Sequence, residues 1–149
     1  MTERPEPSER RYFTLDEANA LLPWLEECFG KLMQLRGQLR GLYSTLDSLG
    51  HRPDAQSLEG SGGSDEVRAA RAKFRGLMEI VHEELATIAD AGVEVKDLDS
   101  GLCDFWSVTA VPGREVYLCW RYGEKRIEFY HDPQAGFAGR KPIPIIPPA

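Results

Sequence analysis

Residues 14–49 read TLDEANALLPWLEECFGKLMQLRGQLRGLYSTLDSL, and this stretch decides the fold of the chain. Leucines recur in it every seven residues, and a second apolar series follows three residues later. The two series are Leu25, Leu32, Leu39 and Leu46, and Cys28, Leu35, Leu42 and Leu49. A repeat of this kind predicts an amphipathic helix that packs along a coiled-coil-like seam. The helix would be roughly 50 Å long. It therefore needs a partner, which is either a second helix of the chain or another subunit.

The beginning of this helix carries two signals. Thr14 stands three residues before Glu17, which is the spacing of a reciprocal capping box. Pro23 lies beyond the first turn, where a proline removes a backbone hydrogen-bond donor. We therefore expect either a bend near residues 20–24 or a short first helix followed by the long one.

A second helix is predicted over residues 65–91. Its apolar positions recur every seven residues at Val67, Phe74, Val81 and Ile88. Ser64 or Asp65 can cap its start, and Gly92 can end it. The glycine- and serine-rich residues 51–64 predict a loop, and no Gly-Lys-Ser/Thr follows them, which excludes a phosphate-binding P-loop. Two long helices joined by a loop form an antiparallel hairpin.

The apolar period changes to two after Gly92. Runs near residues 93–96, 102–108, 115–122 and 126–131 predict strands, because turn residues separate them. The predicted fold class is α+β: a long, coiled-coil-like antiparallel helical hairpin plus a small three- or four-stranded antiparallel β-meander. We expect a flexible N-terminal arm (1–11), a single domain (12–140, with the hairpin at 14–92 and the meander at 93–132) and a proline-rich tail (141–149).

A turn at residues 123–124 predicts how the last two strands pair. It would place Leu118 opposite Phe129 and Val116 opposite His131. Every apolar partner, with His131 at the strand end, would then lie on one face, as a half-buried sheet requires.

A turn at residues 112–113 would set the pairing of the preceding hairpin, with Asp104 opposite Arg121 and Trp106 opposite Cys119. Charged and aromatic side chains would then share the second face of the sheet. They are Asp104, Trp106, Tyr117, Cys119, Arg121, Arg126, Glu128 and Tyr130. Such a face is either solvated or a shallow polar binding surface.

The composition argues against several classes of protein. A net charge of -6 argues against nucleic-acid binding driven by electrostatics. A nucleic-acid surface is therefore the least favoured hypothesis, and it would use Arg114, Arg121, Lys125, Arg126, Arg140 and Lys141. The chain has no apolar run of membrane-spanning length and no signal peptide, so we expect no membrane partner. Its three cysteines, without a CxxC pair, predict a reduced, cytoplasmic protein.

The cysteines and His131 raise the question of a metal. Cys103, Cys119 and His131 could supply a thiolate–imidazole set. Their spacing matches no zinc finger, so from the sequence we assign no metal, and the sequence leaves any cofactor unknown. A histidine at this strand end is typical of a buried packing residue. The alternative is general acid–base catalysis, because the unperturbed pKa of histidine lies near neutrality.

Several short motifs in the chain are distinctive. They are GLCDF (101–105), VYLCWRYGE (116–124), YHD (130–132) and GFAGR (136–140), together with YFTLDEAN (12–19) near the start. With these motifs the chain resembles, from about Arg11 to Ile143, the bacterial family catalogued as domain of unknown function 2203. The resemblance implies a bacterial origin and a helix pair with a sheet, and it implies no activity. The family's pattern often has proline after Asp-Phe, where this chain has Trp106.

The polar residues of these motifs fall at strand ends and in the loop after His131, where scaffolds usually carry binding groups. A carboxylate, an imidazole and a guanidinium together form a workable hydrolytic or anion-binding set. The candidate ligand-binding residues are Asp104, Arg121, Glu124, His131 and Arg140.

The leading functional hypothesis is a self-associating interaction or scaffold module without catalysis. Helices whose apolar face is too wide for a small sheet to cover favour a homodimer. The alternative is a protein that binds a small ligand or anion, with hydrolytic or metal-binding chemistry, through the polar candidates. The sequence specifies neither catalytic residues nor whether the protein is an enzyme. The alternative requires that the five candidate side chains converge.

Overall fold

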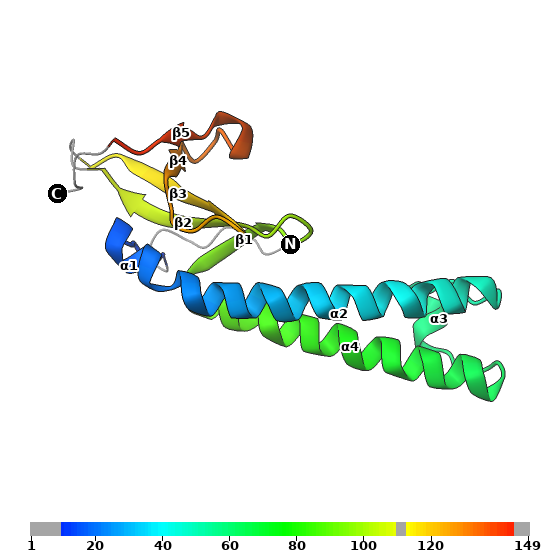
Figure 1. Cartoon of the computed structure of the whole chain (residues 1–149). Coiled ribbons are helices and arrows are strands. Elements are labelled where there is room, and N and C mark those ends of the chain that lie inside the picture. Colours follow the sequence, from blue (N-terminus) through cyan, green and yellow to red (C-terminus); the bar gives the residue numbers. More distant parts are fainter. Residues whose placement is uncertain (1–9, 110–112, 145–149) are drawn as a thin grey trace. The chain divides into compact units, whose positions relative to one another are not determined.

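The computed structural model describes residues 10–109 and 113–144 of the 149-residue chain. Residues 30–85 form one compact unit, and the described residues before and after them form a second (Figure 1). The elements are α1 (Leu15–Ala20), α2 (Leu22–Ser48), α3 (Ala55–Glu59), α4 (Asp65–Asp90), β1 (Val93–Asp97), β2 (Leu102–Val108), β3 (Glu115–Arg121), β4 (Phe129–His131), the 3₁₀ helix η2 (Phe137–Gly139) and β5 (Lys141–Pro142). Most of the expected N-terminal arm and the end of the expected tail lie outside the described residues.

In the first unit, α2 and α4 lie side by side and run in opposite directions (Figure 1). Their seam residues bury one another. The buried cluster contains Leu46, Val67, Ala70 and Phe74, with Leu39, Leu42, Leu58 and Met78 packed against it. The predicted antiparallel hairpin is therefore confirmed, and the seam finds its partner helix within the same chain.

The segment predicted to be a loop, residues 51–64, contains the short helix α3. Asp54 caps this helix: its carboxylate accepts the Ser57 N–H at 2.7 Å, and the Ser57 hydroxyl accepts the Asp54 N–H at 2.9 Å. This is a capping box in which serine takes the place of the usual Glu or Gln. The prediction of a structureless loop was wrong here because the glycines begin only after α3 ends.

The start of the long helix follows one of the two predicted alternatives, a short helix and then a long one. Thr14 and Glu17 form the predicted capping box at the start of α1, with hydrogen bonds of 2.9 and 3.1 Å. Pro23 is the second residue of α2. A proline is tolerated there because the first N–H groups of a helix have no partner within it.

The second unit contains an antiparallel sheet with five strands in the order β1-β2-β3-β4-β5. The prediction of three or four strands was one short, because Lys141 and Pro142, assigned to the tail, pair with β4. Strand β4 is also shorter than predicted. The Ile127 N–H before it donates to the Asn19 side chain at 2.8 Å, so this segment is held by α1 instead of by a neighbouring strand.

The β2–β3 pairing differs from the predicted pairing by two residues. Asp104 is opposite Cys119, and Trp106 is opposite Tyr117. The loop is longer than a tight two-residue turn, since the Thr109 N–H donates to the Arg114 carbonyl at 2.9 Å. A shift of two keeps each side chain on its predicted face, because side chains alternate along a strand.

The β3–β4 pairing differs from the predicted pairing by one residue, with larger consequences. His131 is opposite Tyr117 instead of Val116, and Phe129 is opposite Cys119 instead of Leu118. His131 therefore lies on the polar face and not on the apolar face. Tyr130, predicted on the polar face, moves to the other one.

The apolar face of the sheet packs on the flanking helical segments of its own unit. Phe13, just before α1, meets Phe105 edge-on with ring centroids 5.3 Å apart. Phe29 of α2 meets Trp120 at 6.0 Å. All four rings are buried, so this face forms the core of the unit and leaves the opposite face for polar side chains.

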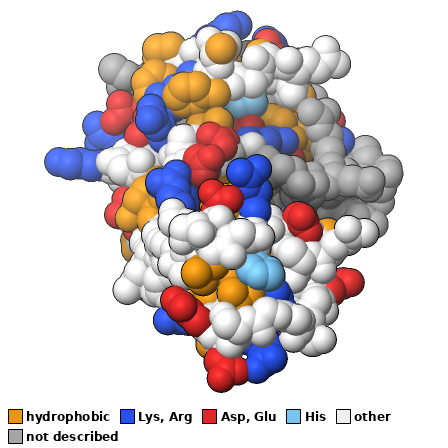
Figure 2. Space-filling view, turned by 90° about the vertical axis from the view of Figure 1, so that its right-hand side faces the viewer, with side chains coloured by type: hydrophobic (Ala, Val, Ile, Leu, Met, Phe, Trp, Pro, Cys, Tyr) orange, Lys and Arg blue, Asp and Glu red, His pale blue; other side chains and the backbone are white. Residues whose placement is uncertain are grey.

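Figure 2 shows one face of the molecule, on which Lys and Arg side chains are interspersed with Asp and Glu. On its described part, no extended field of one sign is visible. Among the described residues, no helix is both long enough and apolar enough to cross a membrane.

The Thr14 cap gives a test of the fold. Replacing Thr14 with alanine removes the acceptor of the Glu17 N–H and should lower the free energy of unfolding by about 1 kcal/mol, measured by urea denaturation. Ser44→Ala, at an exposed position inside α2, is the control and should cause no loss, because alanine favours a helix interior. Equal stability of Thr14→Ala and the native protein would contradict the cap.

Candidate functional site

Three side chains of the polar face meet on β2, β3 and β4. Asp104 is directly opposite Cys119, and His131 lies next to them because its partner Tyr117 is two residues from Cys119. The carboxylate, thiol and imidazole atoms lie within 4.8 Å of one another. Asp104 and His131 are 2% exposed and Cys119 is 0% exposed. We call Asp104, Cys119 and His131 the central cluster.

Both ring nitrogens of His131 have an oxygen neighbour. Nδ1 lies 2.8 Å from the Asp132 carbonyl oxygen, and Nε2 lies 3.0 Å from Asp104 Oδ2. A carbonyl oxygen only accepts hydrogen bonds, so Nδ1 must carry a proton. A neutral imidazole would then present a lone pair from Nε2 to a carboxylate oxygen. The contact is favourable only if a second proton or a metal cation lies between them.

Without a metal, the structure favours a proton between Nε2 of His131 and the Asp104 carboxylate. Burial opposes the charged imidazolium, but hydrogen bonds to Asp104, Cys119 and the Asp132 carbonyl outweigh it and raise the pKa of His131 from 6.5 to about 10. At neutral pH His131 and Asp104 therefore form a buried ion pair. Such a pair costs desolvation energy for both ions, but removal of one partner is destabilising because it leaves the other charge buried without compensation.

The second oxygen of Asp104 is not satisfied. Oδ1 is buried and accepts no hydrogen bond from any residue that the structure describes. A buried carboxylate oxygen without a donor costs free energy. The central cluster therefore has an unused negative ligand atom.

A second ion pair adjoins the central cluster. Arg140 donates to both carboxylate oxygens of Glu124 at 2.9 and 3.2 Å, and it also contacts Cys119 Sγ at 4.0 Å. Its guanidinium stacks on Phe129 and Phe137, with ring centroids 4.0 and 4.3 Å away. Burial opposes the charge on Arg140, but hydrogen bonds and charge interactions with Glu124 and Cys119 together outweigh burial, so the pKa of Arg140 lies above its usual value. Arg140 is thus a cation held in place, and its N–H can donate a charge-assisted hydrogen bond to Cys119 when that thiol is ionised.

Aromatic rings and one more carboxylate border the central cluster. Tyr117 lies between His131 and Trp106, with ring centroids 5.3 and 4.0 Å away. Its hydroxyl donates to Glu94 at 2.9 Å, and Lys96 pairs with Glu94 at 2.8 Å. Sequence reasoning did not single out Glu94, although its alternation with Val93 and Val95 placed it on this face.

The sequence pattern of one protein family matches residues 11–143, which include every residue of this site. The chain belongs to the DUF2203 family. The description of that family is "Uncharacterized conserved protein". No curated protein and no solved structure matches the chain.

The structure brings four of the five sequence-derived candidates of this DUF2203 chain together. Asp104 and His131 are in contact, and the Glu124–Arg140 pair reaches them through Cys119. Arg121 is the exception, because its side chain is exposed and it is the Arg121 backbone that bonds to Glu124, with the N–H donating to the Glu124 carboxylate at 2.7 Å. Whether the four converging residues bind a ligand stays a prediction.

Of the possible metal ligands suggested by the sequence, Cys103, Cys119 and His131, the first does not lie in the central cluster. Cys103 pairs with Trp120 and lies on the opposite face of the sheet from Cys119. Burial, together with Asp104, raises the pKa of the Cys103 thiol well above its usual value. The third possible metal ligand beside Cys119 and His131 is therefore Asp104 and not Cys103.

The geometry of the central cluster does not suit nucleophilic catalysis by Cys119. A Cys–His–Asp arrangement needs one imidazole nitrogen for the nucleophile and the other for the orienting acid. Here both nitrogens of His131 already have an oxygen partner, and the sulfur is fully buried.

The same geometry does suit a metal. Thiolate, imidazole and carboxylate are the ligands of zinc sites, and a metal-bound histidine usually donates its other N–H to a carbonyl or a carboxylate. The Nδ1 contact with the Asp132 carbonyl matches that arrangement. Ligand atoms of a tetrahedral zinc site lie roughly 3.3 to 3.6 Å apart, given the usual bond lengths. In the central cluster Nε2 and Asp104 Oδ2 are 3.0 Å apart and the three ligand atoms lie within 4.8 Å of one another, so the observed separations bracket these values.

The His131–Asp104 pair predicts a pH dependence for metal-free protein, measured with a chelator present. Folding raises the pKa of His131, so the protonated imidazole stabilises the folded state. This stabilisation is complete below pH 6.5, declines above that pH and is lost as the pH passes about 10. The stability difference between the native protein and Asp104→Asn should therefore shrink across this interval. Urea denaturation at several pH values measures it, and a constant difference would rule out the ion pair.

Proposed function

We propose that this DUF2203 protein binds one divalent transition-metal ion, of the Zn²⁺ class, through Asp104, Cys119 and His131. The observation that carries the proposal is the orientation of His131. Its Nδ1 is held by a carbonyl, so Nε2 is directed at Asp104, where a metal cation would take the place of the proton. The unsatisfied Asp104 Oδ1 supports the same proposal.

The donor set selects the class of ion. Mg²⁺ and Ca²⁺ prefer sites made of oxygen atoms, and a site with a sulfur and an imidazole nitrogen serves them poorly. Thiolate and imidazole favour zinc and its neighbours in the first transition row. Binding releases protons from Cys119 and His131 and exchanges a buried ion pair for metal–ligand bonds.

A bound ion would join three neighbouring strands at one point and satisfy the buried charges of the central cluster. Three protein ligands leave one of four tetrahedral positions for water or a small anion. Arg140, fixed by Glu124 and in contact with Cys119, adds positive charge that favours an anion there. The anion-binding hypothesis drawn from the sequence is thus compatible with this proposal.

The metal is tested with two matched cysteine variants. Cys119 and Cys103 are both 0% exposed and lie on neighbouring strands, but only Cys119 is in the central cluster. Native protein and Cys103→Ala, purified without a chelator, should each bind about one metal ion per chain. With Co²⁺ they should show the absorption band of a thiolate–cobalt bond. Cys119→Ala should lose the band and more than about 100-fold in affinity, since even ligand-supporting residues contribute 10- to 100-fold.

Stability provides a second measurement of the same site. Zn²⁺ at 100 times its dissociation constant should raise the free energy of unfolding of the native protein by about 2.7 kcal/mol. His131→Gln should show no such increase. Native protein that neither retains nor takes up a metal, or Cys119→Ala that binds as Cys103→Ala does, would disprove the proposal.

The homodimer expected from the sequence stays a prediction. The structure weakens one reason for it, because α2 and α4 bury their seams against each other within one chain. Of the large hydrophobic side chains in the described hairpin, Tyr43, Leu49 and Ile80 are the exposed ones. Light scattering at micromolar concentration should give twice the mass of the chain if the prediction holds, and a strict monomer would refute it.

A further inference from the structure

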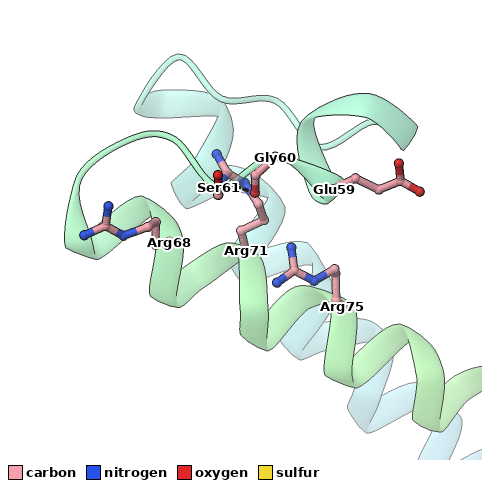
Figure 3. A pocket seen from close by; sticks show the side chains of 6 residues that line it. All are labelled: Glu59, Gly60, Ser61, Arg68, Arg71 and Arg75. Atoms are coloured by element: carbon pink, nitrogen blue, oxygen red, sulfur yellow. Dashed lines mark hydrogen bonds between the residues drawn. The ribbon is translucent and has the colours of Figure 1, made fainter.

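The hairpin unit contains a hollow of about 430 Å³ that is separate from the central cluster. Figure 3 shows it between the end of α3 and the first turns of α4, with three arginines on its helical side. Its lining residues are Glu59, Gly60, Ser61, Arg68, Arg71 and Arg75.

The three arginines share this hollow because of their spacing. Arg68, Arg71 and Arg75 are three and four residues apart on α4, and residues at this spacing lie on one side of a helix. In Figure 3 Arg71 and Arg75 extend from α4 toward Gly60 and Ser61 after α3, whereas Arg68 extends to the side, away from these two arginines.

Arg71 is the most buried of the three, with 5% of the residue exposed. Its Nη1 donates to the Gly60 carbonyl at 2.7 Å and to the Gly62 carbonyl at 2.9 Å. Arg75 likewise donates to the Leu58 carbonyl. These partners are neutral, and within the described part of the chain neither Arg71 nor Arg75 forms an ion pair.

The surrounding carboxylates do not neutralise this charge. Glu59 lines the hollow, but its side chain extends away from Arg71 in Figure 3. Asp65 pairs with Arg68, and 96% of its side chain is exposed, so the pair is largely screened by solvent. A nearly buried guanidinium with only carbonyl partners is costly, and an anion would reduce that cost.

We propose that this hollow binds the phosphoryl group of a small molecule, held by Arg71 and Arg75 with help from Arg68. Guanidinium groups match the oxygens of a phosphate in pairs, which makes arginine the common residue for this ligand. The volume lies within the roughly 300 to 1,000 Å³ of small-molecule sites, so it holds more than a single carboxylate group. This site shares no residue with the central cluster and is independent of the proposed metal.

Calorimetry on the full chain at low salt, with inorganic pyrophosphate as the probe, tests this site. The native protein should bind pyrophosphate more tightly than citrate, which carries carboxylates instead of phosphates. Affinity should fall as salt is added, because the interaction is between charges. Arg71→Gln should weaken binding roughly 10- to 100-fold, since a hydrogen bond to a charged group is lost.

Two further variants separate binding from loop structure. Arg68 is exposed and donates to Asp65 of its own helix instead of to a carbonyl of the facing segment, so Arg68→Gln should fold normally and still bind about 10-fold more weakly. Arg40→Gln removes an exposed arginine of α2 outside the hollow and should bind as the native protein does. Absence of pyrophosphate binding at low salt, or equal binding by all variants, would overturn the proposal. A preference for citrate would also overturn it.

Discussion

The pairing of β3 with β4 is the constraint on which the rest of the polar face depends. Because Tyr117 is opposite His131, the imidazole lies on the same face as Asp104 and Cys119. Contacts between the end of β3 and the loop that follows it shape the turn toward β4. The Glu124 N–H closes a turn onto the Arg121 carbonyl at 2.9 Å, and the Trp120 indole N–H donates to the Glu124 carbonyl at 2.9 Å. A slip of one residue would place His131 among the apolar side chains and leave Asp104 buried without a partner.

Polar groups in both units illustrate one rule, that a buried charge needs a compensating neighbour. In the sheet, Asp104 has the His131 imidazolium on one oxygen, and no described residue donates a hydrogen bond to the other. In the hairpin, Arg71 has two carbonyl dipoles and no carboxylate. Arg140, in contrast, has a complete set of partners in Glu124 and two aromatic rings. The incompletely satisfied groups are therefore better candidates for ligand contacts than the complete pairs.

Local signals in the sequence predicted the helices well, because they depend on residues only a few positions apart. The Thr14–Glu17 box and the seven-residue repeats are examples. Pairings that depend on loop shape were not predictable in the same way. His131 was placed on the wrong face because the segment after Glu124 is held by Asn19, more than a hundred residues away. Contacts between residues far apart in the sequence also limited the prediction of the site. Arg121 was included because it lies near a strand end. Cys119, which links the two ion pairs, was considered only as a metal ligand.

The attachment of Phe13 to β2 has a consequence for how the protein is made. The Phe13 N–H donates to the Trp106 carbonyl at 2.7 Å, and the Ser107 hydroxyl donates to the Phe13 carbonyl at 2.6 Å. These partners lie more than ninety positions apart, so the start of the chain leaves the ribosome long before its binding strand exists. The helical hairpin needs only the residues up to the end of α4 and can form first. Phe13 therefore cannot reach its native hydrogen-bond partners until β2 has been synthesised.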